Sequence, residues 1–357
     1  MKRIVVWVAV LTAMLLAFSV FPQSSSEPTK VIKIIDPDNG PGTDYVSLNE
    51  FARREKRDLV KLNEIAIALC RSSNGSPDGP AQFDKWVTDS LRYVMVVADT
   101  NHRATAKWDT TKYRIIEHST INSECIDVEI DNMVIDGIQM RLTGGGPKND
   151  VIDPEPKIDK LVVKNCFLWL DIQDISGTAL DPGSDVDVFN CIIKSSGGGS
   201  NAILLKQRGD RMPLANVCNN TFIGWQRAIK TEGLCRAVNN LVRDCKSRKV
   251  FSTSDDGEFT ADSDFNSTNH AGTAIVKSPR SSTAAPWFNG DIPADEIFVD
   301  PESNDYRFKQ TSVFIGIGVG PEASAHIPGS DMKQQPRSGK NTDLGPQSAS
   351  GEGERKK

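Results

Sequence analysis

Four short segments decide the fold of this chain: VKNCF (163–167), VFNCI (188–192), NNTFI (219–223) and VNNLV (238–242). Each segment places an asparagine among β-branched or aromatic residues. Aligned on Asn165, Asn190, Asn220 and Asn240, they are spaced by 25, 30 and 20 residues (165 to 190, 190 to 220, 220 to 240). A related DFN (264–266) follows Asn240 by 26 residues (240 to 266), and DNMV (131–134) precedes Asn165 by 33 (132 to 165). The chain therefore carries an internal repeat, which is typical of solenoid proteins.

A second feature repeats in step with the first. Small-plus-apolar pairs occur at Ala179-Leu180, Ala202-Ile203, Ala228-Ile229 and Val250-Phe251, and their first members are 23, 26 and 22 residues apart (179 to 202, 202 to 228, 228 to 250). Two anchors that keep step, with variable lengths between them, predict stacked coils with loop insertions. The region from 163 to 251 thus contains the best-defined coils.

The composition of the repeats favours β-strands over helices. The apolar runs are short and β-branched and lack a 3.6-residue period, which argues against a helical solenoid. The leucine spacing of leucine-rich repeats is absent, and the Asn-Gly and Asp-Gly dipeptides of tight hairpins are scarce in this part. We therefore expect a parallel coil of about 20 to 30 residues with three short strands. We interpret the asparagine column as a ladder of side-chain amides; a row of ligand-binding amides is the alternative.

This pattern resembles the pectate-lyase-like superfamily of right-handed parallel β-helix proteins, over residues 31 to about 320. The V-x-N-x-aromatic segments carry most of the resemblance. GTDYVSL (42–48) looks like the opening segment of many such proteins, and FVDP (298–301) with NDYRF (304–308) looks like the segment that often closes them. The resemblance implies an all-β solenoid. It also implies contact with polysaccharide, because the family's enzymes mostly cleave acidic polysaccharides.

The opening segment predicts a helix that covers the exposed edge of the first coil. Ser47 and Glu50 form a capping box, and Leu48, Phe51 and Ala52 supply an apolar face, so we expect a helix over residues 48–56. Residues 64–71, 93–98, 113–117 and 128–140 are predicted to supply strands of the early coils. The polar region 254–287 is interpreted as a long excursion or as irregular last coils.

The two ends of the chain differ from its body. A basic start, an apolar run over residues 4–21 and a polar exit predict a signal peptide at 1–25; an uncleaved anchor is the competing interpretation. We expect a secreted, periplasmic or cell-surface protein with no membrane span after cleavage. The β-helix is predicted over 26–320. Residues 321–357 are poor in large apolar side chains and are predicted to form a disordered tail.

Charge and cysteine content restrict the possible functions. The net charge of −5 argues against a general nucleic-acid binder. The 7 cysteines form no C-x-x-C pair and several lie in apolar strands, so we expect buried hydrophobic residues rather than a metal or redox site. The 4 histidines are scattered without metal-ligand spacing. Signature triplets of the family's hydrolases and the Trp-Ile-Asp-His of its lyases are absent.

One polar column remains as a candidate site. The residue before each small-plus-apolar pair is in turn Thr178, Asn201, Arg227 and Lys249, and stacking would align them on one face. The candidate catalytic residues are Arg227 and Lys249, and the candidate substrate-binding residues are Asn201, Lys206, Trp225 and Lys230, with the Trp225 ring expected to stack on a sugar. The alternative is a solvated outer face.

A group of carboxylates follows this column, and it is the only cofactor candidate. The group contains Asp255, Asp256, Glu258, Asp262 and Asp264. Oxygen ligands crowded in one loop suit Ca²⁺, so Asp255 and Asp256 are the candidate metal ligands. An ordinary acidic loop is the alternative.

Three functions are consistent with the sequence. The first is an exported β-helix protein that contacts extracellular or cell-surface polysaccharide without a clear catalytic signature. The second is a calcium-dependent lyase of uronate polymers, with Arg227 or Lys249 as the base. The third is a structural or adhesive surface protein. The oligomeric state is left open.

Overall fold

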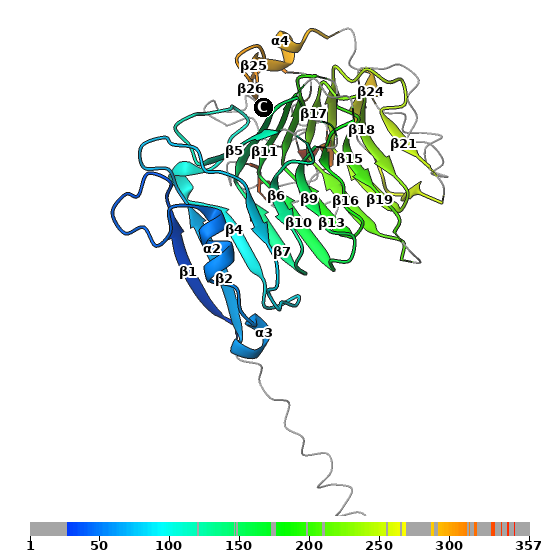
Figure 1. Ribbon diagram of the computed structural model, residues 1–357. Coiled ribbons are helices and arrows are strands. Elements are labelled where there is room, and N and C mark those ends of the chain that lie inside the picture. Colours follow the sequence, from blue (N-terminus) through cyan, green and yellow to red (C-terminus); the bar gives the residue numbers. More distant parts are fainter. Residues whose placement is uncertain are drawn as a thin grey trace, which may run out of the picture.

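The chain folds as a right-handed parallel β-helix with three parallel sheets (Figure 1). The computed structural model describes residues 27–312 apart from 120, 146, 148, 173–175, 198, 209–210, 255, 265, 269–286, 289–291, together with 314, 318–319, 330–332, 337, 341–342 and 346. The predicted signal peptide therefore lies outside the described residues. In the described part of the chain, no helix is long and apolar enough to cross a membrane.

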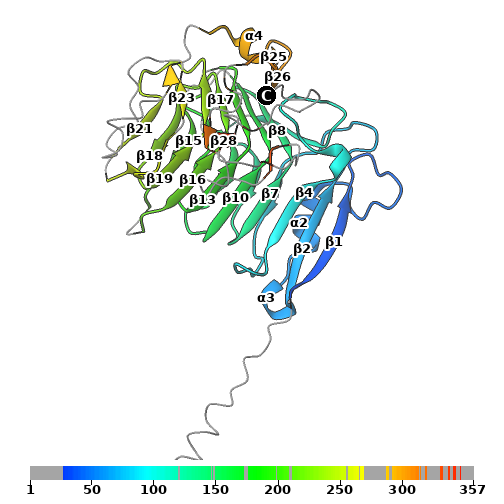
Figure 2. The same ribbon diagram turned by 180° about the vertical axis from the view of Figure 1, so that it is seen from behind.

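From β4 (Val94–Ala98) to β21 (Phe251–Thr253) the chain passes repeatedly through sheet 1, sheet 2 and sheet 3 in that order. Sheet 1 has the order β1 (Thr29–Ile35), β2 (Glu64–Cys70), β4 (Val94–Ala98), β7 (Met133–Asp136), β10 (Lys160–Lys164), β13 (Asp185–Phe189), β16 (Leu214–Cys218), β19 (Leu234–Val238) and β22 (Glu258–Phe259). Sheet 2 has the order β5 (Arg114–Ser119), β8 (Gln139–Gly144), β11 (Phe167–Ile172), β14 (Ile192–Ser195), β17 (Thr221–Ile223), β20 (Leu241–Arg243), β23 (Ser267–Thr268) and β24 (Trp287–Phe288). Sheet 3 has the order β3 (Ala81–Phe83), β6 (Glu124–Val128), β9 (Asp150–Pro154), β12 (Thr178–Leu180), β15 (Asn201–Leu205), β18 (Arg227–Thr231) and β21 (Phe251–Thr253). Figure 2 shows the strands of sheet 1 side by side from behind.

The interior of the coils is one continuous apolar core. Stacked strands place equivalent inward residues on top of each other, as in the column Ile126, Ile152, Leu180, Ile203 and Ile229, and all of these are fully buried. The seven cysteines are buried and unpaired, and this confirms their prediction as buried hydrophobic residues. Because neighbouring coils share this core, each coil depends on the next for its burial.

The asparagine repeat forms amide ladders, but the predicted column divides into two. Asn190 Nδ2 donates to Asn165 Oδ1 at 3.1 Å on one ladder. On the other, Asn240 lies between Asn220 (3.1 Å) and Asn266 (2.9 Å). The strand register aligns Asn190 with Asn219 rather than with Asn220, so the predicted alignment was wrong by one residue there.

The backbone explains the division into two ladders. Asn165, Asn190, Asn219 and Asn239 all have φ between 55° and 58°, the left-handed conformation that asparagine tolerates between sheets 1 and 2. The residue that follows each of these asparagines lies at the position of the second, buried ladder, which contains Asn220 and Asn240. The sequence pattern had placed Asn132 in the same column as Asn165, and that prediction was wrong. Gly137, with φ of +79°, takes that position in its coil.

The predicted capping helix is confirmed as α2 (Leu48–Arg54), two residues shorter than expected. Ser47 Oγ accepts a hydrogen bond from Glu50 N at 3.1 Å, and Leu48, Phe51 and Ala52 are buried. The helix packs against β3, β1 and β2, so it covers the open end of the first coil. Two further short helices follow it, α3 (Leu59–Leu62) and the 3-10 turn η1 (Thr100–His102).

Two expectations for the coils need correction. The predicted strand over 128–140 instead contains the end of β6, all of β7 and the start of β8, because two corners of one coil fall within it. The segment expected to close the solenoid lies along its side. It forms α4 (Ala294–Ile297), β25 (Phe298–Asp300) and β26 (Asp305–Phe308), which Figure 1 shows beside the solenoid. Phe298 and Tyr306 pack on the outer face of sheet 2.

The described residues beyond 317 also pack against the solenoid. β27 (Gly318–Val319) pairs antiparallel with β28 (Asn341–Thr342), Met332 is fully buried, and Asn190 Nδ2 donates to Ser330 O at 2.9 Å. Among the described residues, Phe314 and Met332 pack in the hydrophobic cluster on the outer face of sheet 2. Most of the predicted tail, residues 321–357, lies outside the described residues, and its disorder stays a prediction.

Candidate functional site

The predicted polar column exists on the outer face of sheet 3. Thr178 pairs with Asn201, and Asn201 pairs with Arg227. Ile229 pairs with Phe251 on the next coil, which places Lys249 beside Arg227. The second sequence anchor thus predicted the register of sheet 3 correctly.

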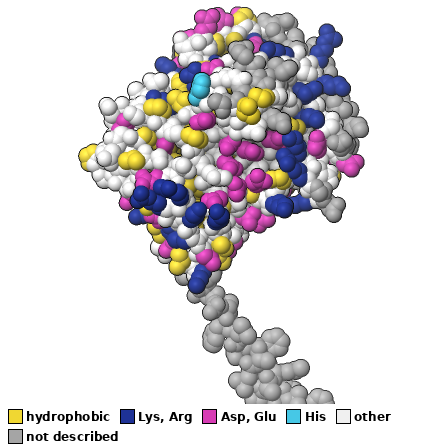
Figure 3. Space-filling model, in the orientation of Figure 1, with side chains coloured by type: hydrophobic (Ala, Val, Ile, Leu, Met, Phe, Trp, Pro, Cys, Tyr) yellow, Lys and Arg dark blue, Asp and Glu magenta, His cyan; other side chains and the backbone are white. Residues whose placement is uncertain are grey.

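The same column extends toward the N-terminus and becomes acidic. Thr178 pairs with Asp150, and Asp150 pairs with Glu124. A parallel column contains Asp127 and its partner Asp153, and Asp181 follows Leu180 in the next coil. We call the five acidic residues among them the carboxylate band: Glu124, Asp127, Asp150, Asp153 and Asp181. Figure 3 shows Asp and Glu side chains gathered on this face, with Lys and Arg side chains beside them.

Few cations neutralise the start of the band. Gln82 Nε2 donates to Asp127 Oδ2 at 2.9 Å, and Thr178 donates to Asp150 through its hydroxyl and through its backbone N at 3.2 Å. These donors are neutral, so the negative charges of Asp127 and Asp150 are not paired by them. A cavity of about 240 Å³ adjoins the band where α2 approaches sheet 3, and it is lined by Asn49, Pro80, Ala81, Gln82, Glu124 and Asp127.

The environment of the band favours protonated carboxyl groups. Burial raises the pKa of Glu124 to about 7, and the negative charges of Asp127, Asp153 and Asp150 contribute further. Burial likewise raises the pKa of Asp127 to about 6 and that of Asp150 to about 7. Glu124 and Asp150 lie on adjacent strands, so one can hold a proton near neutral pH while the other is ionised. Such a pair can act as general acid and general base.

The cations of the site lie on the C-terminal side of the band. Lys206 Nζ donates to Asp181, whose pKa is nevertheless raised by burial. Lys230 Nζ lies 3.5 Å from Glu232. Arg227 forms no ion pair with any described residue, and Lys249 is exposed. The predicted basic column is therefore partly neutralised by its own carboxylates.

Two predicted substrate-binding residues are buried. Trp225 is fully buried, and its indole N–H donates to Ile193 O at 3.0 Å, so the predicted stacking on a sugar is wrong. Gly224 turns the chain with φ of +76°, and Gly199 leaves room for the ring, since a Cβ there would lie 2.7 Å from Trp225. Asn201 is 2 % exposed and donates to Ser200 Oγ at 2.7 Å, so it lies below the surface that a ligand would contact.

The predicted calcium ligands are not brought together in the described part of the chain. Asp255 lies outside the described residues, and Asp256 is exposed on a turn. Asp262 accepts hydrogen bonds from Arg236 Nε at 2.5 Å and from Thr260 Oγ1 at 2.7 Å. Among the described residues, no group of three His, Cys, Asp or Glu side chains is placed to hold a metal ion.

The carboxylate band was missed by the sequence reasoning, although a signal for it exists. ECID (124–127), DVID (150–153) and TALD (178–181) share an outward polar residue followed three positions later by Asp. The first two are 26 residues apart (124 to 150), which equals the longest of the later spacings (202 to 228). Extending the second anchor by two coils would have found them.

Comparisons with known proteins identify no relative: no family model, no curated protein and no solved structure matches this chain. The site must therefore be interpreted from its own geometry. That geometry is a partly buried row of carboxylates with raised pKa values, followed by partly paired cations, on one face of the solenoid.

Proposed function

We propose that this protein binds a polysaccharide along the outer face of sheet 3, with the carboxylate band as the main contact surface. The observation that carries the proposal is the in-register repetition of carboxylates over three successive coils. Adjacent strands are about 4.8 Å apart, so the band offers hydrogen-bond acceptors at regular intervals along an extended chain. Carboxylates accept bidentate hydrogen bonds from sugar hydroxyls.

The sign of the charge favours a neutral polysaccharide over a uronate polymer. At and above neutral pH, where these carboxyl groups become ionised, Asp127, Asp150 and Asp153 would repel a polyanion at the N-terminal half of the face, because like charges across an interface are unfavourable. The cations that could attract a polyanion are partly paired, as Lys206 is with Asp181 and Lys230 with Glu232. This charge distribution weakens the lyase alternative, in which Arg227 or Lys249 would be the base and calcium would be required.

A second candidate function is hydrolysis of a glycosidic bond at the same band. Glu124 and Asp150 face each other on adjacent strands, and both have a pKa of about 7. Glycosidases use two carboxyl groups, one protonated and one ionised, about 5 to 10 Å apart. The facing pair provides both protonation states near neutral pH. Membership of the pectate-lyase-like superfamily is also proposed, on the basis of the solenoid and its amide ladders.

Affinity electrophoresis tests the binding proposal. Gels are cast with neutral polysaccharides (β-glucan, xylan, mannan) or with polyuronates (pectate, alginate). We expect a neutral polymer to retard the protein and the double variant Asp127→Asn/Asp150→Asn to lose most of the retardation. Glu258→Gln, at an exposed carboxylate on β22, is the matched control and should behave as the unmodified chain does. Retardation by polyuronates alone, or by none of the polymers, would refute the proposal.

Product analysis separates the catalytic candidates. Hydrolysis releases reducing ends without ultraviolet absorbance, and we expect Glu124→Gln to abolish it while binding persists. A lyase would instead form unsaturated products that absorb in the ultraviolet, and chelation would stop it.

Cell fractionation tests the proposed export. Tight envelope retention without binding to any polysaccharide would favour a structural or adhesive role.

A further inference from the structure

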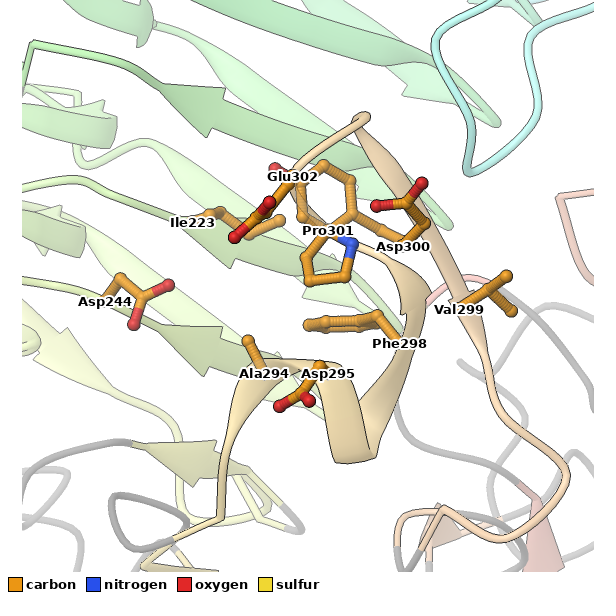
Figure 4. A pocket seen from close by; sticks show the side chains of 10 residues that line it. Ile223, Asp244, Ala294, Asp295, Phe298, Val299, Asp300, Pro301 and Glu302 are labelled. Carbon is orange, nitrogen blue, oxygen red and sulfur yellow. The ribbon is translucent and has the colours of Figure 1, made fainter.

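A second cavity lies on a different part of the molecule, between the C-terminal segment and the edge of sheet 2. Its volume is about 590 Å³. One wall is formed by Ile223 at the end of β17 and by Asp244 just after β20, and the other by α4, β25 and the turn that follows (Figure 4). This volume lies within the range of small-molecule sites, which is about 300 to 1,000 Å³.

The inner surface of the cavity is apolar and aromatic. Phe298 and Tyr306 are 1 % and 5 % exposed, and their ring centroids lie 5.4 Å apart in an edge-to-face arrangement. Ile223 and Pro301 complete this surface. Phe298 also stacks on Phe308, with ring centroids 5.9 Å apart, so the aromatic wall is held from behind. A rigid wall of this kind accommodates an aliphatic chain without reorganisation.

The rim of the cavity is acidic. Asp244, Asp295 and Glu302 line it and are exposed, and none of the three forms an ion pair with a described residue. Figure 4 shows Asp244 and Glu302 on one side of Phe298 and Pro301, with Asp295 on α4 below. No lysine, arginine or histidine is among the described residues that line the cavity. The rim therefore attracts cations and repels anions.

The Tyr306 hydroxyl provides a further polar group at this cavity. The tyrosine ring is buried, and no described residue forms a hydrogen bond with its hydroxyl. Because Tyr306 lines the cavity and its hydroxyl oxygen is not enclosed by the protein, the hydroxyl is free to hydrogen-bond a molecule bound in the cavity. Burial and the negative charge of Asp244 both raise the pKa of Tyr306, and the hydroxyl therefore stays protonated.

We propose that this cavity binds an aliphatic ammonium group, with its carbon chain against Phe298 and Pro301 and its charge between Asp244 and Glu302. The Tyr306 hydroxyl accepts a hydrogen bond from the ammonium. Aromatic faces and carboxylates together recognise organic cations. A bare divalent ion fits less well, since it requires several oxygen ligands and would leave the aromatic wall unused. The proposal is independent of the polysaccharide-binding face, because the cavity borders sheet 2.

Isothermal titration calorimetry of the full chain tests the proposal. The probes are 1,5-diaminopentane, its uncharged counterpart 1,5-pentanediol, and a short acetylated peptide with one central lysine. We expect the diamine or the lysine peptide to bind and the diol not to bind. Tighter binding of the diamine identifies a free amine as the source of the ammonium group. Tighter binding of the peptide identifies a lysine side chain of a protein partner.

Two conservative variants test the assigned residues. Asp244→Asn keeps the size of the side chain and tolerates the φ of +57° found there, while Tyr306→Phe removes only the hydroxyl. We expect Asp244→Asn to weaken ammonium binding about tenfold and Tyr306→Phe to weaken it severalfold. Asp256→Asn, at an exposed carboxylate before β22, is the control. Unchanged thermal unfolding of each variant excludes a folding defect. Equal binding of the diol, no binding of either ammonium probe, or unchanged binding by Asp244→Asn overturns the proposal.

Discussion

Replacing Glu124 by glutamine should make the protein more stable at alkaline pH and leave it nearly unchanged at acid pH. Glu124 lies in the carboxylate band, between the negative charges of Asp127 and Asp150. Its carboxylate accepts no hydrogen bond from a described residue. Glutamine therefore preserves the shape of the side chain and removes only its capacity to become charged.

The sign and size of the effect follow from the raised pKa. The pKa of Glu124 in the folded chain is about 7, against an ordinary value of 4.5. Between these values the folded chain keeps a proton that the unfolded chain has released. The stability contributed by Glu124 is therefore complete below the ordinary pKa and is lost as the pH rises toward 7. The full shift corresponds to roughly 3 kcal/mol at about 1.4 kcal/mol per pKa unit, and partial exposure with coupled neighbours reduces this to about 1–2 kcal/mol.

Guanidinium chloride unfolding at about pH 4.5 and about pH 8 measures this effect. We expect Glu124→Gln to exceed the unmodified chain by about 1–2 kcal/mol at the higher pH and by a few tenths of a kcal/mol or less at the lower. Glu258→Gln controls for the loss of an exposed carboxylate and should show no such dependence. If Glu124→Gln shows the same pH dependence as the unmodified chain, the assignment of a partly buried carboxyl group with a raised pKa at this position is wrong.

Three further substitutions test the fold. Asn240→Ala should lower the free energy of unfolding by about 3 kcal/mol, because its ladder partners lose their hydrogen bonds inside the core. The control Gln310→Ala, at the surface, should change it by less than about 0.5 kcal/mol. Thermal and denaturant unfolding measure both variants. Trp225→Ala should lower the free energy of unfolding by about 3–5 kcal/mol, because it leaves a cavity in the core. The folded variant should still be retarded by the polysaccharide. Loss of retardation without loss of stability would show that the ring contacts the polysaccharide. Arg103→Met should lower the free energy of unfolding by about 3–5 kcal/mol, because it leaves the buried carboxylate of Asp136 without its ion-pair partner. A smaller loss in denaturant unfolding would show that the other partners of Asp136 are sufficient to stabilise it.

The repeat could be predicted because its physical cause is local. A coil must turn between sheets 1 and 2 in the left-handed conformation, and asparagine is among the few residues that tolerate it, so Asn165 and Asn190 recur. The small-plus-apolar pairs likewise mark inward positions of sheet 3. The one-residue error at Asn220 has an equally physical cause. Two adjacent asparagines occupy the corner there, and only hydrogen bonding across coils distinguishes their positions.

The candidate site was harder to predict because its parts are distant in the sequence. Glu124 and Asp150 are unremarkable residues in separate coils, and only parallel pairing makes them neighbours with raised pKa values. Trp225 was assigned to the surface because it lies near the polar column in the sequence, two residues before Arg227. The turn at Gly224 and the space beside Gly199 direct it into the core instead.

The sequence by itself determined the parallel solenoid, the capping helix and the register of sheet 3, because period, capping residues and inward apolar positions are properties of short segments. Only the tertiary structure decided where charge gathers and what covers the outer faces. Stacking joins residues that are one coil apart into columns, and side chains of α4, β25 and β26 cover part of the outer face of sheet 2. Such contacts depend on the packing of whole coils against each other, and no local pattern encodes them.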